Sequence, residues 1–378
     1  MAIINGTDNP ETINADDGVT EQVDLIRGLG GSDTIYGLGG NDRIEGGDDN
    51  DTLYGGADND VLLGENGDDE LIGGVGGDQL FGGEGDDTAS YENSAAGVTV
   101  NLATGVGSGG DAEGDTLSDI ENLKGSGHAD TLIGNDLDNI LEGGGGADFL
   151  QGGLGDDTYG VFGGGSTIVE NPGEGDDVVF AFFETSGSIK VPNNVETLAV
   201  IGGGDGLKVK AVGTSADDSI QGGSIQGTVE FRLSGLGGDD TLMGGEKSDW
   251  LGGGIGNDTL DGSDGTDKLI GSRGKDSLFG GADRDFFDFN SIKDSVKGSN
   301  RDVIGDFERG IDDIDLRDID AKKGVSGNNK FKFIGKQDFH DKKGELRYED
   351  KGSKVVVQGD VNGDGKADFE ILVKVGAL

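Results

Sequence analysis

Aspartate recurs every nine residues in three stretches of this sequence, and that spacing is its most prominent chemical feature. The chain has no Cys and two His, so the ligands on offer are carboxylates, which are hard oxygen donors. Such donors favour Ca²⁺ over Zn²⁺ or Cu²⁺, and over Mg²⁺, which prefers octahedral sites that retain water. We therefore expect calcium ligands at Asp33, Asp42, Asp51, Asp60, Asp69, Asp78, Asp87, Asp130, Asp148, Asp157, Asp240, Asp249, Asp258, Asp267, Asp276 and Asp285.

Each of these aspartates occupies the same place in a nine-residue unit. Gly residues precede it and, in most units, Leu or Ile follows two positions later, as in GLGGNDRIE at 37–45. The last three residues of a unit suit a short strand, whose middle side chain points to one face. The Gly-rich remainder suits a tight turn with positive φ. Two strands and two turns then make one coil in eighteen residues, and successive coils stack as parallel strands about 4.8 Å apart.

Stacking of the coils would place every second aspartate in one column, with the Leu and Ile residues filling a thin core between two sheets. Two carboxylates about 5 Å apart repel by about 3 kcal/mol at an effective dielectric near 20, and a divalent cation between them reverses the sign. The expected columns are Asp33, Asp51, Asp69 and Asp87 on one edge and Asp42, Asp60 and Asp78 on the opposite edge.

The units resemble the motif G-G-x-G-x-D-x-U-x of RTX (repeats-in-toxin, haemolysin-type) calcium-binding proteins. The resemblance implies an all-β fold, a parallel β-roll or solenoid, in which each Ca²⁺ lies between turns n and n+2. Asp side chains and turn carbonyls would hold the ions, so that Asp51 and Asp69 share one and Asp258 and Asp276 share another. About ten Ca²⁺ would bind in this way. Three turns depart from the motif, at Asn139, Lys247 and Lys275.

Composition limits the possible partners. The net charge is −46 and apolar residues make up 32 %, so without help much of the chain should stay disordered. A surface this acidic repels nucleic acid and anionic membranes. We expect no disulfide, because Cys is absent, and no membrane span, because no run of about 18 apolar residues exists. The first residues show no cleavable secretory signal.

The charge is unevenly distributed along the chain. Residues 1–285 hold 12 basic and 56 acidic residues, whereas residues 286–378 hold 17 and 19, so we expect a boundary near Asp285. The two spacers between arrays contain strand-like runs that suit wider coils, and we find no chemical motif in them. The predicted segments are an N-terminal cap at 1–27, arrays at 28–90, 125–160 and 213–288, spacers at 91–124 and 161–212, and a C-terminal domain at 289–378.

The C-terminal region is similar to the domain that follows the β-roll in serralysin-type secreted proteins. The resemblance covers nearly all of 285–378, including DFFDF at 285–289 and RDVIGDF at 301–307. It implies a β-rich cap on the roll and recognition by type I secretion machinery, hence a secreted, extracellular protein. The family often continues to a short apolar-acidic tail, whereas this sequence ends at Val375–Leu378.

A further candidate site lies between two strand-like runs near the end of the chain. Its D-x-N-x-D-G-x-x-D spacing places oxygen ligands at positions 1, 3, 5 and 9 of a calcium loop, with Gly at position 6 for the turn. The Glu of an EF-hand at position 12 is replaced by Ile371. We expect a Ca²⁺-binding hairpin loop with ligands Asp360, Asn362, Asp364 and Asp368.

The sequence shows no catalytic motif: it contains no H-E-x-x-H and no G-x-S-x-G. The repeats begin near residue 28, which leaves no room for an N-terminal catalytic domain in this sequence. We predict a non-catalytic secreted calcium-binding protein that folds on binding multiple Ca²⁺ outside the cell. One alternative is an adhesin or polysaccharide-binding module using Trp250 and the outward residues Leu63, Ile72 and Phe81; another is the accessory C-terminal region of a secreted hydrolase or epimerase.

Overall fold

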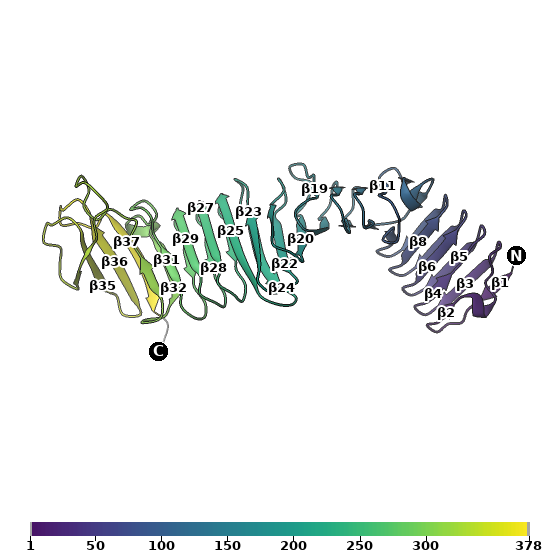
Figure 1. Cartoon of the computed structure of the whole chain (residues 1–378), viewed down its shortest axis with the longest axis horizontal. Helices are drawn as coiled ribbons and strands as arrows, with labels where there is room; N and C mark the ends of the chain where they lie inside the picture. The colour runs from purple at the N-terminus through teal and green to yellow at the C-terminus, as the bar shows by residue number, and fades with distance from the viewer. Residues whose placement is uncertain (1, 376–378) are drawn as a thin grey trace. The chain divides into compact units, whose positions relative to one another are not determined.

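The computed structural model describes residues 2–375, so the end of the predicted tail, residues 376–378, lies outside the described residues. The chain divides into two compact units, Met1–Phe180 with Pro192–Val195, and Ala181–Val191 with Glu196–Leu378. In each unit short strands alternate between two sheets, and strands two apart in the chain are parallel neighbours in one sheet. Figure 1 shows this for β2, β4, β6 and β8 near the N-terminus. The predicted parallel β-roll is confirmed.

The first unit contains two sheets and two 3-10 turns. The turns are η1 (Ala15–Asp17) and η2 (Gly110–Ala112). One sheet runs β1 (Ile3–Asn5), β3 (Leu25–Gly30), β5 (Arg43–Asp48), β7 (Val61–Asn66), β9 (Gln79–Glu84), β13 (Thr116–Ser118), β12 (Val106–Ser108), β11 (Thr99–Asn101), β15 (Thr131–Ile133), β17 (Phe149–Gln151) and β19 (Thr167–Ile168). The facing strands are β2 (Thr12–Ile13), β4 (Thr34–Tyr36), β6 (Thr52–Ala57), β8 (Glu70–Val75), β10 (Thr88–Ser90), β14 (Asn122–Lys124), β16 (Ile140–Glu142) and β18 (Thr158–Phe162), and β20 (Val178–Phe183) spans the boundary of the units.

The second unit repeats this arrangement and ends in antiparallel strands. One sheet runs β21 (Gly187–Lys190), β23 (Leu207–Val212), β25 (Val229–Gly237), β27 (Trp250–Ile255), β29 (Lys268–Arg273), β31 (Phe286–Asp288) and β33 (Asp313–Asp315). The other strands are β22 (Thr197–Gly202), β24 (Ser219–Ser224), β26 (Thr241–Met243), β28 (Thr259–Asp261), β30 (Ser277–Phe279), β32 (Asp302–Phe307), β34 (Lys332–Gly335), β35 (Glu345–Asp350), β36 (Lys354–Asp360) and β37 (Phe369–Val375). The turn η3 (Gly298–Asn300) precedes β32.

The core of each coil is one apolar side chain per strand. The residues two positions after each repeat aspartate have no exposed surface, from Ile35 and Leu53 in the first array to Leu278 and Phe287 in the third. Register explains this: Ile35 is paired with Leu53 and Leu53 with Leu71, so identical positions stack coil upon coil. A one-residue slip would expose the whole column, which fixes the register of the turns as well.

Several strands are longer than the three residues predicted. In β6 and β8 the pairing continues into the turn, with Gly56 opposite Gly74 and Ala57 opposite Val75. Coil length also varies: Thr197 is paired with Ser219, so this coil contains 22 residues instead of 18. The first spacer inserts an antiparallel pair, β11 with β12, into the sheet. Such coils contain more residues, but their strands stay paired in register with the strands of the neighbouring coils.

Candidate metal centres

The repeat aspartates form columns along the edges of the sheets. The backbone N–H of Asp33 donates to Oδ1 of Asp51 at 2.7 Å, and the N–H of Asp51 donates to Oδ1 of Asp69 at 2.7 Å. The other column of the first array has the same bonds, from Asp42 to Asp60 at 2.7 Å and from Asp60 to Asp78 at 2.8 Å. The period of eighteen therefore brings every second aspartate into direct contact, and each Oδ1 is satisfied by the coil before it.

Oδ2, the second oxygen of most of these carboxylates, is buried and has no hydrogen-bond partner among the described residues. No donor among residues 2–375 reaches Oδ2 of thirteen of the sixteen predicted Asp ligands, and a buried polar atom without a partner carries its full desolvation cost. These thirteen residues occur in all three arrays. The thirteen are Asp33, Asp42, Asp51, Asp60, Asp69, Asp78, Asp87, Asp157, Asp240, Asp258, Asp267, Asp276 and Asp285.

In seven of the thirteen turns a backbone carbonyl lies beside the same glycine as the orphaned oxygen. A Cβ built on Gly64 would lie 2.2 Å from Oδ2 of Asp69 and 2.6 Å from the carbonyl oxygen of Gly82, so oxygens of two successive coils converge beside one glycine. Gly55 shows the same arrangement, with Oδ2 of Asp60 and the carbonyl of Gly73 each at 2.5 Å. Carboxylate and carbonyl oxygens together are the donor set that Ca²⁺ prefers, and they fit that ion.

We call a turn open when its second residue has a positive φ. The turns of the thirteen orphaned aspartates and of Asp148 are all open. Nine open-turn residues in this left-handed region are not glycine, at a cost of about 1 kcal/mol each; they are Leu29, Leu38, Asp49, Asp58, Glu65, Leu236, Ser263, Ser272 and Asp283. This repeated strain indicates that a further interaction stabilises the open turns.

Within the described arrays at 28–90, 125–160 and 213–288, four turns lack a positive φ at the second residue, and we call them closed. In each, the N–H of the second residue donates to the side chain of the sixth: Ser126 to Asp130 at 2.6 Å, Asn135 to Asn139 at 2.8 Å, Thr214 to Asp218 at 2.6 Å and Gly245 to Asp249 at 2.6 Å. Among the predicted ligands, Asp130 and Asp249 therefore have protein donors. Asp148 lies in an open turn but accepts a bond from the hydroxyl of Ser166 at 3.0 Å. Calcium binding at these three residues stays a prediction without an orphaned oxygen to support it.

Burial raises the pKa values of the column carboxylates. Desolvation is the largest cause; the N–H donor from the adjacent coil lowers the pKa and neighbouring column carboxylates raise it. The pKa reaches about 7 for Asp51 and Asp60, about 6 for Asp69 and about 8 for Asp267. Without a cation these groups therefore favour a proton near neutral pH, which an ion bound at Oδ2 would displace.

The predicted C-terminal loop joins β36 to β37, which are the two strands expected around it. Its carboxylates accept bonds from loop amides: Asp360 from Gly363 at 2.6 Å and Gly365 at 2.9 Å, and Asp368 from Val361 at 2.8 Å. The predicted ligand Asn362 accepts from the N–H of Asp364 at 2.8 Å. The loop is held by its own amide donors, and calcium binding there stays a prediction.

Sequence reasoning missed carboxylates that continue the columns through the spacers. The N–H of Asp78 donates to Asp115 at 2.8 Å, that of Asp276 to Asp302 at 3.0 Å and that of Asp157 to Asp177 at 2.9 Å. Coils of 37, 26 and 20 residues hide these from a search at period eighteen. The available signal was the local pattern of Asp followed two residues later by a column residue, as in DTL at 115–117, DVI at 302–304 and DVV at 177–179.

The residues suggested for other functions lie elsewhere. Trp250 has the Arg232 guanidinium 4.4 Å from its ring centroid, and a Cβ on Gly252 would meet the same ring at 2.5 Å. Of the outward residues, Phe81 is 37 % exposed, whereas Leu63 and Ile72 are half-buried. His340 pairs with Glu345 at 3.1 Å and the N–H of His128 donates to Ser126. No helix in the described part of the chain is long and apolar enough to cross a membrane.

Comparison with known families agrees with this geometry. A family model described as peptidase M10 serralysin C terminal matches residues 111–377. A model of the RTX calcium-binding nonapeptide repeat, in four copies, matches residues 20–53 and 54–89. No curated protein matches the chain. Since the first match covers more than half of the sequence, the chain belongs to the serralysin C-terminal family of peptidase M10, preceded by RTX calcium-binding nonapeptide repeats.

Proposed function

We propose that this chain is a secreted, non-catalytic calcium-binding protein whose roll folds as Ca²⁺ enters the open turns. The observation that carries the proposal is the row of thirteen buried Oδ2 atoms that no described donor reaches. Carboxylate and carbonyl oxygens of successive coils converge at several of them, as beside Gly55 and Gly64. A divalent ion bonded to these oxygens would remove the repulsion along a column and the desolvation cost together.

Binding and folding are then one equilibrium. The oxygens of one site come from two coils, as with Asp69 and Gly82, so the site does not exist in the unfolded chain. Each ion therefore stabilises the fold by RT ln(1 + [Ca²⁺]/Kd), about 2.7 kcal/mol at a hundredfold excess over Kd. Several such sites are enough to fold a chain that buries few apolar side chains per coil.

Folding that is coupled to calcium binding suits secretion of the chain from the cell. At low Ca²⁺ inside a cell the chain would stay unfolded and able to pass through type I secretion machinery; outside, at about millimolar Ca²⁺, it would fold. The family match supports this route, because RTX repeats and serralysin C-terminal domains are typical of type I secreted proteins. It also supports a non-catalytic role, because the matched family is the non-catalytic part of a peptidase.

The test is far-UV circular dichroism of the full chain, titrated with Ca²⁺ from EGTA to about 10 mM. Mg²⁺ over the same range is the matched control, because it has the same charge but a poorer fit to these ligands. We expect a cooperative change from coil to β-structure with Ca²⁺ and little change with Mg²⁺. A β-signal already complete in EGTA, and unaltered by Ca²⁺, would contradict metal-driven folding.

Secretion is tested separately in cells. The full chain is expressed with and without a type I transporter, and the culture medium is assayed for it. Equal export in the absence of the transporter would reject the secretion route while leaving calcium-linked folding intact.

A further inference from the structure

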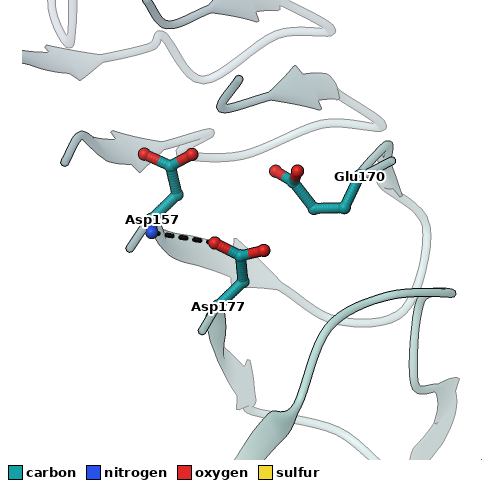
Figure 2. A group of neighbouring side chains, drawn as sticks. All are labelled: Asp157, Glu170 and Asp177. Atoms are coloured by element: carbon teal, nitrogen blue, oxygen red, sulfur yellow. Dashed lines mark hydrogen bonds between the residues drawn. The ribbon is translucent and has the colours of Figure 1, made fainter. Parts of the chain in front are cut away.

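A group of three carboxylates lies in the coil where the second array meets the second spacer. Asp157 is the last repeat aspartate of the array, Asp177 opens the next strand of the same column, and Glu170 comes from the loop between them. Each offers one carboxylate oxygen, and these three atoms lie within 4.8 Å of one another. Figure 2 shows the three side chains directed toward one another from separate segments of the coil.

All three side chains are buried, and Asp157 and Glu170 each bring an unbonded oxygen to the group. Asp157 is 1 % exposed and Glu170 is 6 % exposed, and neither Oδ2 of Asp157 nor Oε2 of Glu170 has a hydrogen-bond partner among the described residues. Glu174, in the same loop, lies close enough to raise the pKa of Glu170, but a carboxylate offers no donor. The groups that perturb Asp157 and Glu170 are carboxylates and N–H donors, with no Lys or Arg among them.

The remaining oxygens of the group are held in place by the chain. Oε1 of Glu170 accepts bonds from the Tyr159 hydroxyl and from the N–H of Gly152 at 3.3 Å, and its backbone carbonyl accepts from Asn194 at 2.8 Å. Oδ1 of Asp177 accepts from the N–H of Asp157 at 2.9 Å. Hydrogen bonds therefore fix one oxygen of Glu170 and one oxygen of Asp177. The side chains of the group are thus positioned before an ion binds.

We propose that Glu170 joins Asp157 and Asp177 to make this open turn a three-carboxylate site for one Ca²⁺, unlike the other open turns. The ligands are oxygen only, without His or Cys, which disfavours Zn²⁺ and Cu²⁺. Three carboxylates in one site exceed the two aspartates expected to share an ion elsewhere in the columns, and affinity for Ca²⁺ rises with ligand charge and rigidity. This site therefore fills at lower Ca²⁺ than the other open turns.

The coil that builds this site has 20 residues, two more than a repeat coil. The extra length allows the segment after β19 to place Glu170 beside the column aspartates Asp157 and Asp177. The inference does not rest on calcium-driven folding: a roll that folded without calcium would still bind one ion here.

The test replaces Glu170 by Gln in the full chain. Glu170→Gln keeps the shape and the acceptor for Tyr159 but removes one charged ligand, so competition with a fluorescent chelator should show one ion fewer in the tightest class, or at least a tenfold weaker one. The matched control is Asp176→Asn, which removes the same charge from an exposed neighbour in the same loop. Circular dichroism at saturating Ca²⁺ should be unchanged in both variants.

A second variant covers the case in which Glu170→Gln does not fold. Tyr159 lies against Glu170, so it should sensitise the emission of Tb³⁺ bound in place of Ca²⁺, and Tyr159→Phe should lose that emission while retaining the number of ions bound. If Glu170→Gln folds and binds as many ions with the wild-type affinity, or if Tyr159→Phe emits as wild type does, the site is rejected. Loss of calcium-driven folding in the unmodified chain would instead reject the proposed function alone.

Discussion

Acid should replace calcium in folding this chain. Many column carboxylates have a raised pKa in the fold, about 6 for Asp42, about 7 for Asp51 and about 8 for Asp267, mainly because burial penalises the charged form. In the unfolded chain they stay ionised down to about pH 4. Between pH 7 and pH 5 the folded state therefore binds more protons than the unfolded state, and its stability rises as the pH falls.

The size of the effect follows from these pKa values. A carboxylate with a folded pKa of about 7 is half protonated at pH 7 and approaches a gain of about 1.4 kcal/mol per pH unit below it, hence about 2 kcal/mol between pH 7 and pH 5. Eight column residues have this pKa: Asp51, Asp60, Asp87, Asp115, Asp157, Asp240, Asp276 and Asp285. Neighbours in a column titrate together, so their gains do not simply add. One third of the summed gain of these residues between pH 7 and pH 5 is still about 5 kcal/mol, which is comparable to the free energy of unfolding of a whole domain.

The assay is circular dichroism in EDTA from pH 8 to pH 5, with sedimentation to monitor association as the pH approaches the pI of about 4.1. We expect monomeric chain to gain β-structure as the pH falls through about 7, and the calcium needed for folding at pH 8 to become unnecessary at pH 5. Asp267→Asn, which removes a carboxylate of pKa about 8, should move this transition to higher pH. A chain that stays unfolded at pH 5 in EDTA, while folding normally with calcium at pH 8, would refute the electrostatic reasoning.

Three further predictions concern single residues. Gly64→Ala places a methyl group 2.2 Å from Oδ2 of Asp69 and should reduce the ions bound in isothermal titration calorimetry by about one, whereas Gly127→Ala, which meets nothing within 4 Å, should bind as wild type. Asn139→Asp removes the bond from Nδ2 to the Glu121 carbonyl at 2.8 Å and should cost about 1–3 kcal/mol in urea unfolding at saturating Ca²⁺; unchanged stability would show that this bond is dispensable. Because Arg232 lies over Trp250, any polysaccharide binding found on a glycan array should survive Trp250→Ala, and its loss would restore Trp250 as a stacking platform.

The nonapeptide period determined the architecture. A side chain two residues after each aspartate must face inward if strands alternate, and Leu53, Leu62 and Leu71 are completely buried as this requires. The same period fixed the separation of eighteen residues that brings Asp51 onto Asp69. Both follow from the strand period of two and from the constancy of the repeat, which are properties of the sequence alone.

The sequence did not distinguish the two classes of turn. Asp69 and Asp249 have the same spacing, yet Oδ2 of Asp249 accepts the N–H of Gly245, while no donor in the described chain reaches that of Asp69. The difference depends on the sign of φ at the second residue, which is positive at Glu65 and not at Gly245, so the residue type at this position does not predict it. Only the folded backbone decides it.

The position of the spacer carboxylates beside the columns was also determined by tertiary structure. Glu170 follows no repeat, and the sequence gives no reason to pair it with Asp157, thirteen residues earlier. The 20-residue coil brings them together because β18 and β19 hold to the two sheets while the loop between Ile168 and Asp177 turns back over the column. A sequence period identifies the ligands that recur at equal spacing. A ligand contributed by a coil of unequal length can be placed only once the pairing of the strands on either side is known.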